Sequence, residues 1–252
     1  MNKRRLAVFV EGQTELVFVR EFLKQWYGYD TSVIGFVCYN LQNNEFRDAA
    51  YQYGGEDSEN YFMLVNVGND NSVLSKILSR LACLVNQGYQ LVIGLRDMFS
   101  KQYVQDAGGH VIDEKVSQKH IEIVRDVLKS EANGDKVDFH FAIMEVEAWF
   151  LGMHDYLLSV DKRLTGDYIK ESIGVELNAD PEKTIVHPAM ELGRIYSLVG
   201  KQYDKHLSDI SAIMSVLTND DFRKLMGSGK CNSFKMFVES LLTDVRWKKC
   251  DV

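Results

Sequence analysis

Residues 6–15 of the chain read LAVFVEGQTE. The five apolar residues from Leu6 to Val10 predict a strand buried on both faces, which is typical of a parallel sheet. Glu11 and Gly12 follow, and then an amphipathic run begins with apolar residues at helical spacing. This strand–turn–helix pattern predicts that Glu11 lies at the carboxyl edge of the sheet, where open α/β sheets bind ligands. A solvated glutamate in an ordinary turn is the alternative, and the local pattern favours neither.

The same alternation of strand and helix continues through the first three-fifths of the chain. Continuously apolar runs predict buried strands at residues 33–39, 61–67 and 91–95. Residues 137–143 alternate apolar with mostly polar side chains, which indicates a strand near the edge of the sheet. The helical patterns between them cover residues 74–85 and about 114–131. We therefore predict a mostly parallel α/β sheet flanked by helices.

Two polar segments interrupt this pattern. Residues 40–60 contain Gly54, Gly55 and several charged side chains, and we expect an exposed insertion with the form of a hairpin. Residues 159–187 are polar and irregular, and three helical patterns follow them at residues 189–199, 206–217 and 233–242. The predicted division is an α/β domain over residues 1–158 and a helical region over residues 159–252 packed on it.

Composition narrows the class of protein. The formal net charge of −7 argues against a protein that coats nucleic acid non-specifically, but it leaves room for a local basic patch or a basic partner. The longest apolar runs are too short to cross a membrane, and the short apolar run after the basic amino terminus leads directly into Glu11, so we expect neither a membrane span nor a signal peptide.

Cysteine usage indicates the compartment. The four cysteines lie far apart and form no C-x-x-C pair, so a structural zinc site and a disulfide framework are both disfavoured and a reducing cytoplasm fits best. They are Cys38, Cys83, Cys231 and Cys250.

Acidic residues stand at the ends of three predicted strands: Glu11, Asp97 and the pair Glu145 and Glu147. Carboxylates from neighbouring strands would repel one another without a cation between them. Oxygen ligands of this kind suit Mg²⁺ or Mn²⁺ better than zinc, and such an ion can orient a water at a phosphodiester. The alternative is that these acids only decorate the polar ends of strands; three acidic positions at strand ends favour a site.

Two short motifs add a family resemblance. Residues 10–15, VEGQTE, resemble the V-E-G-x-T-E motif that opens Toprim-type domains, especially those related to the OLD-family nucleases. Residues 147–151, EAWFL, resemble the E-a-W-l-L segment of a Toprim-like family with the same start. Residues 179–183, ADPEK, and the helices after them are similar to the carboxyl-terminal part of that family.

The resemblance implies a Toprim-like fold and a metal-dependent nuclease that hydrolyses phosphodiesters of DNA or RNA. Carried over by position, Glu11 would be the acid/base residue, Asp97 a metal ligand and Glu147 a further acidic residue at the Mg²⁺ or Mn²⁺ site. We predict that the carboxylates of all three meet at the carboxyl edge of the sheet, close enough to share that metal ion. It also implies a role in bacterial defence and an ATPase partner protein.

One departure from the family pattern supports a rival interpretation. Where the family has D-x-D, this chain has Asp97-Met98-Phe99, so an aromatic ring replaces the second acid. Glu147, Asp106 or Asp113 could compensate for the missing carboxylate. Without compensation, the chain would be a catalytically degenerate Toprim-like interaction module that lacks the full metal site.

Overall fold

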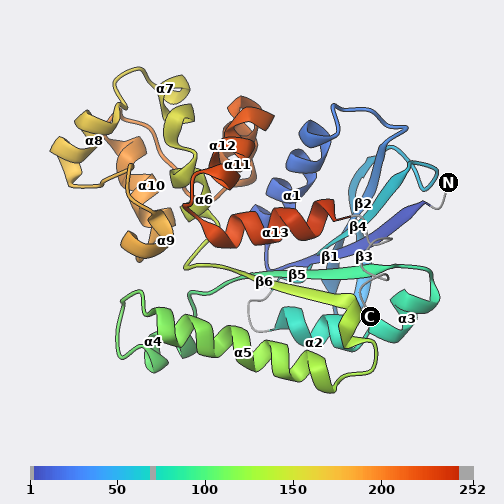
Figure 1. Ribbon diagram of the computed structural model, residues 1–252. Coiled ribbons are helices and arrows are strands. Elements are labelled where there is room, and N and C mark those ends of the chain that lie inside the picture. Colours follow the sequence, from blue (N-terminus) through green and yellow to red (C-terminus); the bar gives the residue numbers. More distant parts are fainter. Residues whose placement is uncertain (1–2, 69–71, 244–252) are drawn as a thin grey trace. The chain divides into compact units, whose positions relative to one another are not determined.

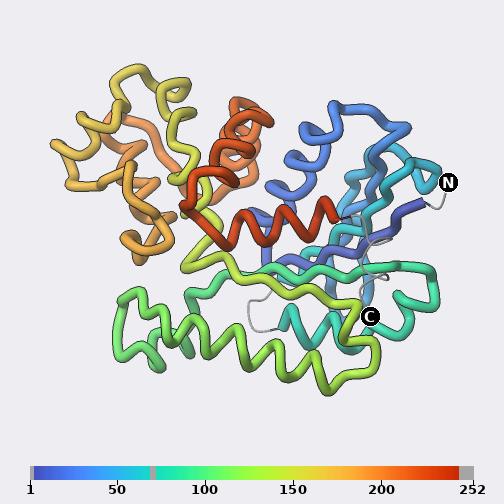
Figure 2. The backbone as a smooth tube through the Cα atoms, viewed as in Figure 1, coloured from blue at the N-terminus to red at the C-terminus, as the bar shows by residue number. Residues whose placement is uncertain are grey.

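The computed structural model describes residues 3–68 and 72–243, and Cys250 lies outside them. By its internal contacts the chain divides into two compact units, each assembled from separate stretches of sequence. The boundary predicted near residue 158 does not coincide with this division, and it stays a prediction about domains. The chain passes between the units after residues 96, 118, 141 and 235 (Figure 2). The first unit comprises Met1–Arg96, Lys119–Phe141 and Met236–Val252, and the second comprises Asp97–Gln118 and Ala142–Lys235.

The first unit contains nearly all of a six-stranded sheet with the order β3-β2-β4-β1-β5-β6 (Figure 1). Strand β1 pairs in parallel with both β4 and β5, and β2 is parallel to β4, which confirms the predicted α/β class. Strand β3 is antiparallel to β2, so the polar insertion forms an edge hairpin. The strands are β1 (Arg4–Val10), β2 (Ile34–Gln42), β3 (Glu45–Tyr53), β4 (Asn60–Asn66), β5 (Leu91–Asp97) and β6 (Val137–Ala142).

Both faces of β1 are covered, as its continuous apolar run predicts. Helix α1 (Gln13–Trp26) packs on β1, β2 and β4 through its apolar side, which includes Phe18 and Phe22. Ala7 and Phe9 point into a separate core cluster together with residues of α2 (Val73–Leu78) and α3 (Leu81–Asn86). Figure 1 shows α1 on one side of the sheet and α2 on the other.

The turn after β1 places Glu11 where the sequence predicts. Its backbone N–H donates to the carbonyl of Leu95, and its carbonyl accepts from Gly68 N–H, so Glu11 lies at the carboxyl edge beside β5 and the end of β4. Gly12 is the N-cap of α1, and its N–H donates to the Glu15 carboxylate at 2.8 Å. That carboxylate lies in the first turn of the helix, where the helix dipole favours negative charge.

One helix prediction in the first half needs correction. The single helix expected over residues 74–85 is two helices, α2 and α3, with a break at Ser79 and Arg80. The break arises because both of these side chains donate to the Lys76 carbonyl in α2. Helix α5 (Glu114–Ser130) agrees closely with its predicted range. Strand β6 occupies the edge of the sheet, as its alternating pattern indicates.

The second unit is helical, and residues 159–187 are not irregular as predicted. They contain α8, which begins at the N-cap Thr165 and ends at Gly174 with φ of 75°, and α9, which begins at the N-cap Asp180 and has Pro181 in its first turn. These helices are too short for apolar periodicity to reveal. Besides α5, the α-helices that follow α3 are α4 (Lys101–Asp106), α6 (Glu147–Gly152), α7 (Leu157–Val160), α8 (Gly166–Ile173), α9 (Pro181–Thr184), α10 (Pro188–Ser197), α11 (Leu207–Val216), α12 (Asn219–Gly227) and α13 (Asn232–Leu242).

No helix among the described residues is both long enough and apolar enough to span a membrane.

The packing of β5 in the first unit yields a stability prediction. A Cβ on Gly94 would overlap the Phe139 ring and lie 2.9 Å from Cδ1 of Ile77. Gly94→Ala should therefore lower the free energy of unfolding by about 1–3 kcal/mol, measured by urea denaturation. Gly227→Ala is the matched control, because a Cβ there meets nothing within 4 Å. Equal stability of the two variants would show that the side chains of Phe139 and Ile77 leave room for a methyl group at position 94.

Candidate functional site

Three carboxylates of the second unit form one group, here called the acidic cluster. Asp97, Glu145 and Glu147 each offer an oxygen, and these oxygens lie within 4.8 Å of one another. Asp97 is the last residue of β5, and the other two follow β6. The structure thus brings together two of the predicted site residues, Asp97 and Glu147, with Glu145 beside them.

Backbone pairing beyond β5 explains this convergence. Met98 N–H donates to the Ala142 carbonyl at 2.8 Å, and Phe99 N–H donates to the Met144 carbonyl at 2.9 Å. Met144 has a φ of 64°, in the left-handed region that non-glycine residues rarely occupy, and this bend directs the chain into α6. Val146 N–H then donates to Oδ1 of Asp97 at 3.0 Å. The Asp97 side chain is therefore fixed at the start of the segment that carries the other two acids.

Glu147 is the fully buried member of the cluster. Its Oε1 accepts a hydrogen bond from the Tyr203 hydroxyl at 2.8 Å. Its Oε2 has no hydrogen-bond partner among the described residues, but it lies 3.2 Å from the Lys205 ammonium, a charge contact without hydrogen-bond geometry. Burial raises the pKa of Glu147, and the positive charge of Lys205 opposes that shift.

Glu145 contacts the same lysine from the other side. Its Oε1 lies 3.0 Å from the Lys205 ammonium, and its Oε2 accepts from Ala189 N–H, in the first turn of α10, at 2.9 Å. Burial acts to lower the pKa of Lys205, but Glu147, Glu145 and Asp97 outweigh it and hold that pKa above its ordinary value. Lys205 is therefore a stably charged cation in contact with the cluster.

Tyr203 and Lys205 are the site residues that the sequence did not reveal. Both belong to residues 198–206, the loop between α10 and α11, about sixty positions after the acids that they contact. Burial beside Glu147 raises the pKa of Tyr203, so its hydroxyl remains a proton donor. No motif surrounds these two residues, and only the fold brings them to the cluster.

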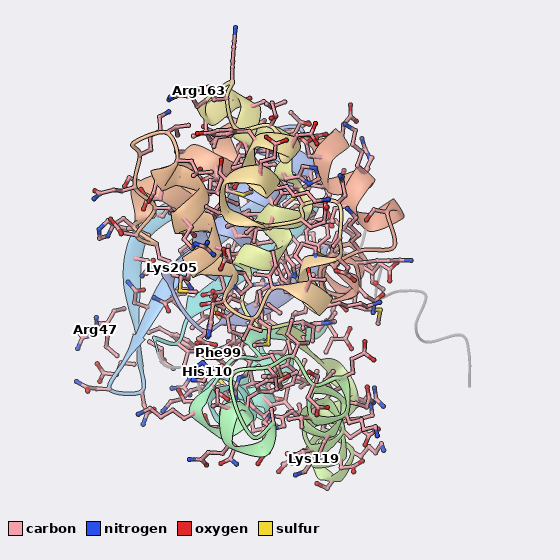
Figure 3. The ribbon with its side chains drawn as sticks, turned by 90° about the vertical axis from the view of Figure 1, so that its left-hand side faces the viewer. Arg47, Phe99, His110, Lys119, Arg163 and Lys205 are labelled. Atoms are coloured by element: carbon pink, nitrogen blue, oxygen red, sulfur yellow. The ribbon has the colours of Figure 1, made fainter. Side chains whose placement is uncertain are left out.

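Phe99 stands where the resembled family has its second acid, and it makes aromatic contacts instead. Its ring centroid lies 5.7 Å from that of His110 (both residues are labelled in Figure 3) and 4.9 Å from that of His187. The two imidazoles meet with ring nitrogens 3.0 Å apart. Of the three residues proposed as compensating acids, Glu147 lies in the acidic cluster. The other two have other hydrogen bonds: Asp113 accepts from backbone N–H groups at the start of α5, and Asp106 accepts from Gln102.

Glu11 belongs to the first unit, and it is not a member of the acidic cluster among the described residues. Its backbone lies at the carboxyl edge of the sheet, beside β5 and the end of β4. A shared site of Glu11 with Asp97 and Glu147 stays a prediction.

The cluster fits a hexacoordinate divalent ion with oxygen ligands. Mg²⁺ binds oxygen at about 2.1 Å, so oxygens on one ion lie about 3.0 Å apart as neighbours and about 4.2 Å apart across it. Oxygens within 4.8 Å of one another need to move only slightly to meet these separations. The buried Oε2 of Glu147, which lacks a hydrogen bond among the described residues, supports the fit, although Lys205 contacts it.

Comparison of the chain with family models, with curated proteins and with solved structures finds no match.

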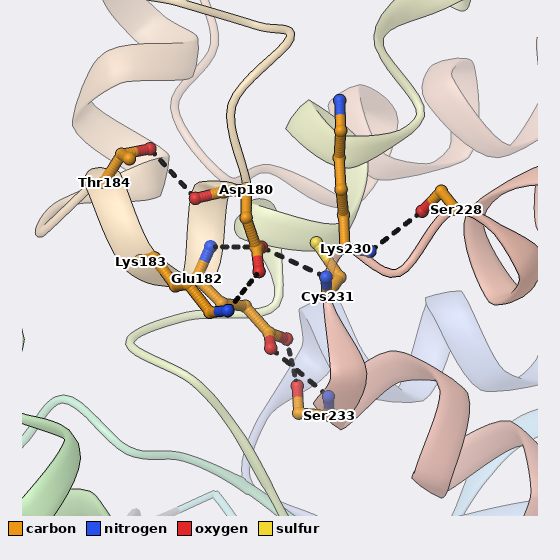
Figure 4. Close-up of polar contacts among 8 residues, drawn as sticks. All are labelled: Asp180, Glu182, Lys183, Thr184, Ser228, Lys230, Cys231 and Ser233. Atoms are coloured by element: carbon orange, nitrogen blue, oxygen red, sulfur yellow. Dashed lines mark hydrogen bonds and ion pairs between the residues drawn. The ribbon is translucent and has the colours of Figure 1, made fainter.

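A second buried carboxylate of this unit has a structural role (Figure 4). Glu182 accepts hydrogen bonds from the Trp149 indole at 3.2 Å and from both the hydroxyl and the backbone N–H of Ser233. Its neighbour Asp180 accepts from the backbone N–H of Glu182 and of Cys231. The ADPEK segment that resembles the family therefore joins α9 to α6 and to the start of α13.

Glu182 generates a prediction on pH and stability. Burial raises its pKa, and the bonds from Ser233 and Trp149 only partly oppose this. Between about pH 4.3, the ordinary glutamate pKa, and the higher folded value, the folded protein binds this proton more tightly than the unfolded chain does. The contribution of Glu182 to the free energy of unfolding therefore decreases as pH rises through that interval.

Glu182→Gln keeps an acceptor oxygen for Ser233 but removes this titration, so the loss of stability with rising pH should disappear in the variant. The free energy of unfolding of wild type minus that of the variant, from urea denaturation at several pH values, should be highest below about pH 4 and lower at pH 7. Glu171→Gln, an exposed glutamate, is the control. A difference that grows with pH would contradict the assignment.

Proposed function

We propose that the protein is a metal-dependent hydrolase of nucleic-acid phosphodiesters. The observation that carries the proposal is the acidic cluster, in which Asp97, Glu145 and Glu147 offer oxygens within 4.8 Å of one another at the end of β5 and beyond β6. Carboxylates in this arrangement suit Mg²⁺ or Mn²⁺. The resemblance of residues 10–15 and 147–151 to Toprim-like nucleases supports the same chemistry.

The proposal gives each acid a role. Asp97, Glu145 and Glu147 hold the metal ion, and Glu11 moves a proton at the scissile phosphate. When bound, the ion supplies positive charge to the phosphate and lowers the pKa of a coordinated water. The Val146 N–H, the Ala189 N–H and the Tyr203 hydroxyl orient the three carboxylates.

The net charge of −7 bears on how such an enzyme would meet nucleic acid. An acidic protein is repelled by a polyanion at long range, so binding requires local positive charge or a basic partner. An ATPase partner and a role in bacterial defence, both implied by the family resemblance, form part of the proposal, as does the cytoplasmic location that cysteine usage favours.

Metal binding provides the first test. Asp97→Asn keeps an acceptor for Val146 N–H but removes a negative ligand, so Mn²⁺ affinity should fall at least about tenfold by isothermal titration calorimetry. Cleavage of plasmid, single-stranded DNA or total RNA in the presence of Mn²⁺ should fall with it. Asp167→Asn, an exposed acid of α8, is the control and should match wild type in both assays. Loss of neither property in Asp97→Asn would remove this residue from the site.

Proton transfer provides an independent test. Glu11→Gln should reduce the cleavage rate about 10²- to 10⁴-fold, because general acid/base groups contribute on that order. Mn²⁺ affinity and the thermal midpoint should stay close to wild type, since Glu11 is assigned to the proton and not to the metal. Glu59→Gln, an exposed glutamate of the same unit, should leave the rate unchanged. A rate equal to wild type in Glu11→Gln would exclude the proposed role.

A second candidate function rests on Phe99 and Lys205. An aromatic ring replaces one acid, and an ammonium group contacts two of the three remaining carboxylates, so the chain could keep the fold as a non-catalytic interaction module. Wild-type protein that binds no Mn²⁺ and cuts none of the three nucleic-acid substrates would favour this candidate over the hydrolase.

A further inference from the structure

The acidic cluster already contains a cation that belongs to the chain. The Lys205 ammonium lies 3.0 Å from Oε1 of Glu145 and 3.2 Å from Oε2 of Glu147. The other oxygen of each glutamate is held by a neutral donor, Ala189 N–H for Glu145 and the Tyr203 hydroxyl for Glu147. The glutamate oxygens that remain for a metal ion are therefore the two that Lys205 contacts.

The backbone around Lys205 holds it in this place. Lys205 has a φ of 58°. This left-handed conformation costs a lysine free energy and persists only where the surrounding structure enforces it. The N–H groups of its two neighbours, Asp204 and His206, both donate to Oδ2 of Asp209 in α11. This common acceptor fixes the backbone on either side of Lys205 and keeps its side chain directed at the acids.

A metal ion and the ammonium group compete for the same two oxygens. An ion bound to Oε1 of Glu145 and Oε2 of Glu147 would take the oxygens with which Nζ pairs and would repel the ammonium as a like charge. The Lys205 side chain is 37% exposed, so it has a route to solvent that does not require the unit to unfold. Exchange of one cation for the other is therefore sterically open.

We propose that Lys205 is a positioning residue of the metal site: it holds the carboxylates of the acidic cluster together before a divalent cation arrives, and that cation displaces it. The proposal rests on the proposed function, because it assumes that the cluster takes a divalent ion. It adds that metal entry is a competition, so removal of the lysine charge raises metal affinity.

Wild-type protein provides the direct test. An amine-acetylating reagent modifies lysines according to the accessibility of the free amine, and mass spectrometry reports each site. Saturating Mn²⁺ should increase the acetylation rate of Lys205 several-fold, because the ammonium leaves its ion pairs. Lys201, an exposed lysine of the same loop, is the internal control and should not change. A Lys205 rate that Mn²⁺ leaves unchanged or lowers overturns the proposal.

Substitution provides the second test. Lys205→Met keeps the length of the side chain but removes its charge, and Mn²⁺ affinity by calorimetry should rise about tenfold. Lys205→Arg keeps the charge and can pair with two carboxylates at once, so Mn²⁺ affinity should fall below wild type. Lys201→Met is the matched control. A purely structural lysine predicts weaker binding in Lys205→Met, and that result would also overturn the proposal.

The outcomes separate this inference from the proposed function. Displacement of Lys205 by Mn²⁺ without cleavage of any nucleic acid supports the inference and refutes the hydrolase. Cleavage that depends on Mn²⁺ while Lys205 keeps its low reactivity supports the hydrolase and refutes the inference. Mn²⁺ binding by Lys205→Met but not by wild type refutes displacement in the natural chain and identifies that chain as the degenerate module.

Discussion

The burial of the Glu147 carboxylate is the constraint on which the candidate site depends. An isolated charge in a protein interior is costly, so a fully buried glutamate needs a proton, a hydrogen bond or a counter-charge. The structure supplies the last two, through Tyr203 and Lys205 from one loop. Removal of one partner from a buried ion pair destabilises a protein more than removal of both, and the loop, α6 and the end of β5 are therefore coupled through this carboxylate. The location of the cluster follows from sheet geometry, whereas its charge balance follows from the loop.

Much of the fold could be predicted because its signals are local. The apolar run before Glu11, the glycine after it and the periodicity of α1 and α5 each follow from side-chain spacing alone. The short helices α8 and α9 could not be predicted from periodicity, since fewer than three turns give no clear apolar stripe. Their signals are the capping residues Thr165 and Asp180. The break between α2 and α3 has a similar origin, in side chains that compete for one backbone carbonyl.

The site was predictable only in part, for the same reason. Asp97 and Glu147 follow strands, and strand ends meet at one edge, so their proximity could be inferred from position in the sequence. Lys205 is more than fifty residues further along, and nothing around it distinguishes it from a solvated surface lysine. The sequence shows that Phe99 cannot bind a metal, but its contacts with His110 and His187 depend on tertiary structure. Electrostatic compensation at the cluster is thus a property of the fold that a single sequence does not display.

The two candidate functions require the same fold, and they differ in the free energy with which the acidic cluster binds a divalent cation instead of Lys205. A cluster that binds its own lysine and one that binds a divalent cation use the same carboxylate oxygens, so the occupant depends on which cation gains more there. Each factor of ten in metal affinity corresponds to about 1.4 kcal/mol, and the loss of one acidic ligand is of that order or larger. Phe99 offers no oxygen ligand, and the lysine contacts do not involve it, because they are made to Glu145 and Glu147. Under the proposed function, the choice between metal enzyme and inert module therefore depends on metal affinity at these oxygens, while the fold is the same in both.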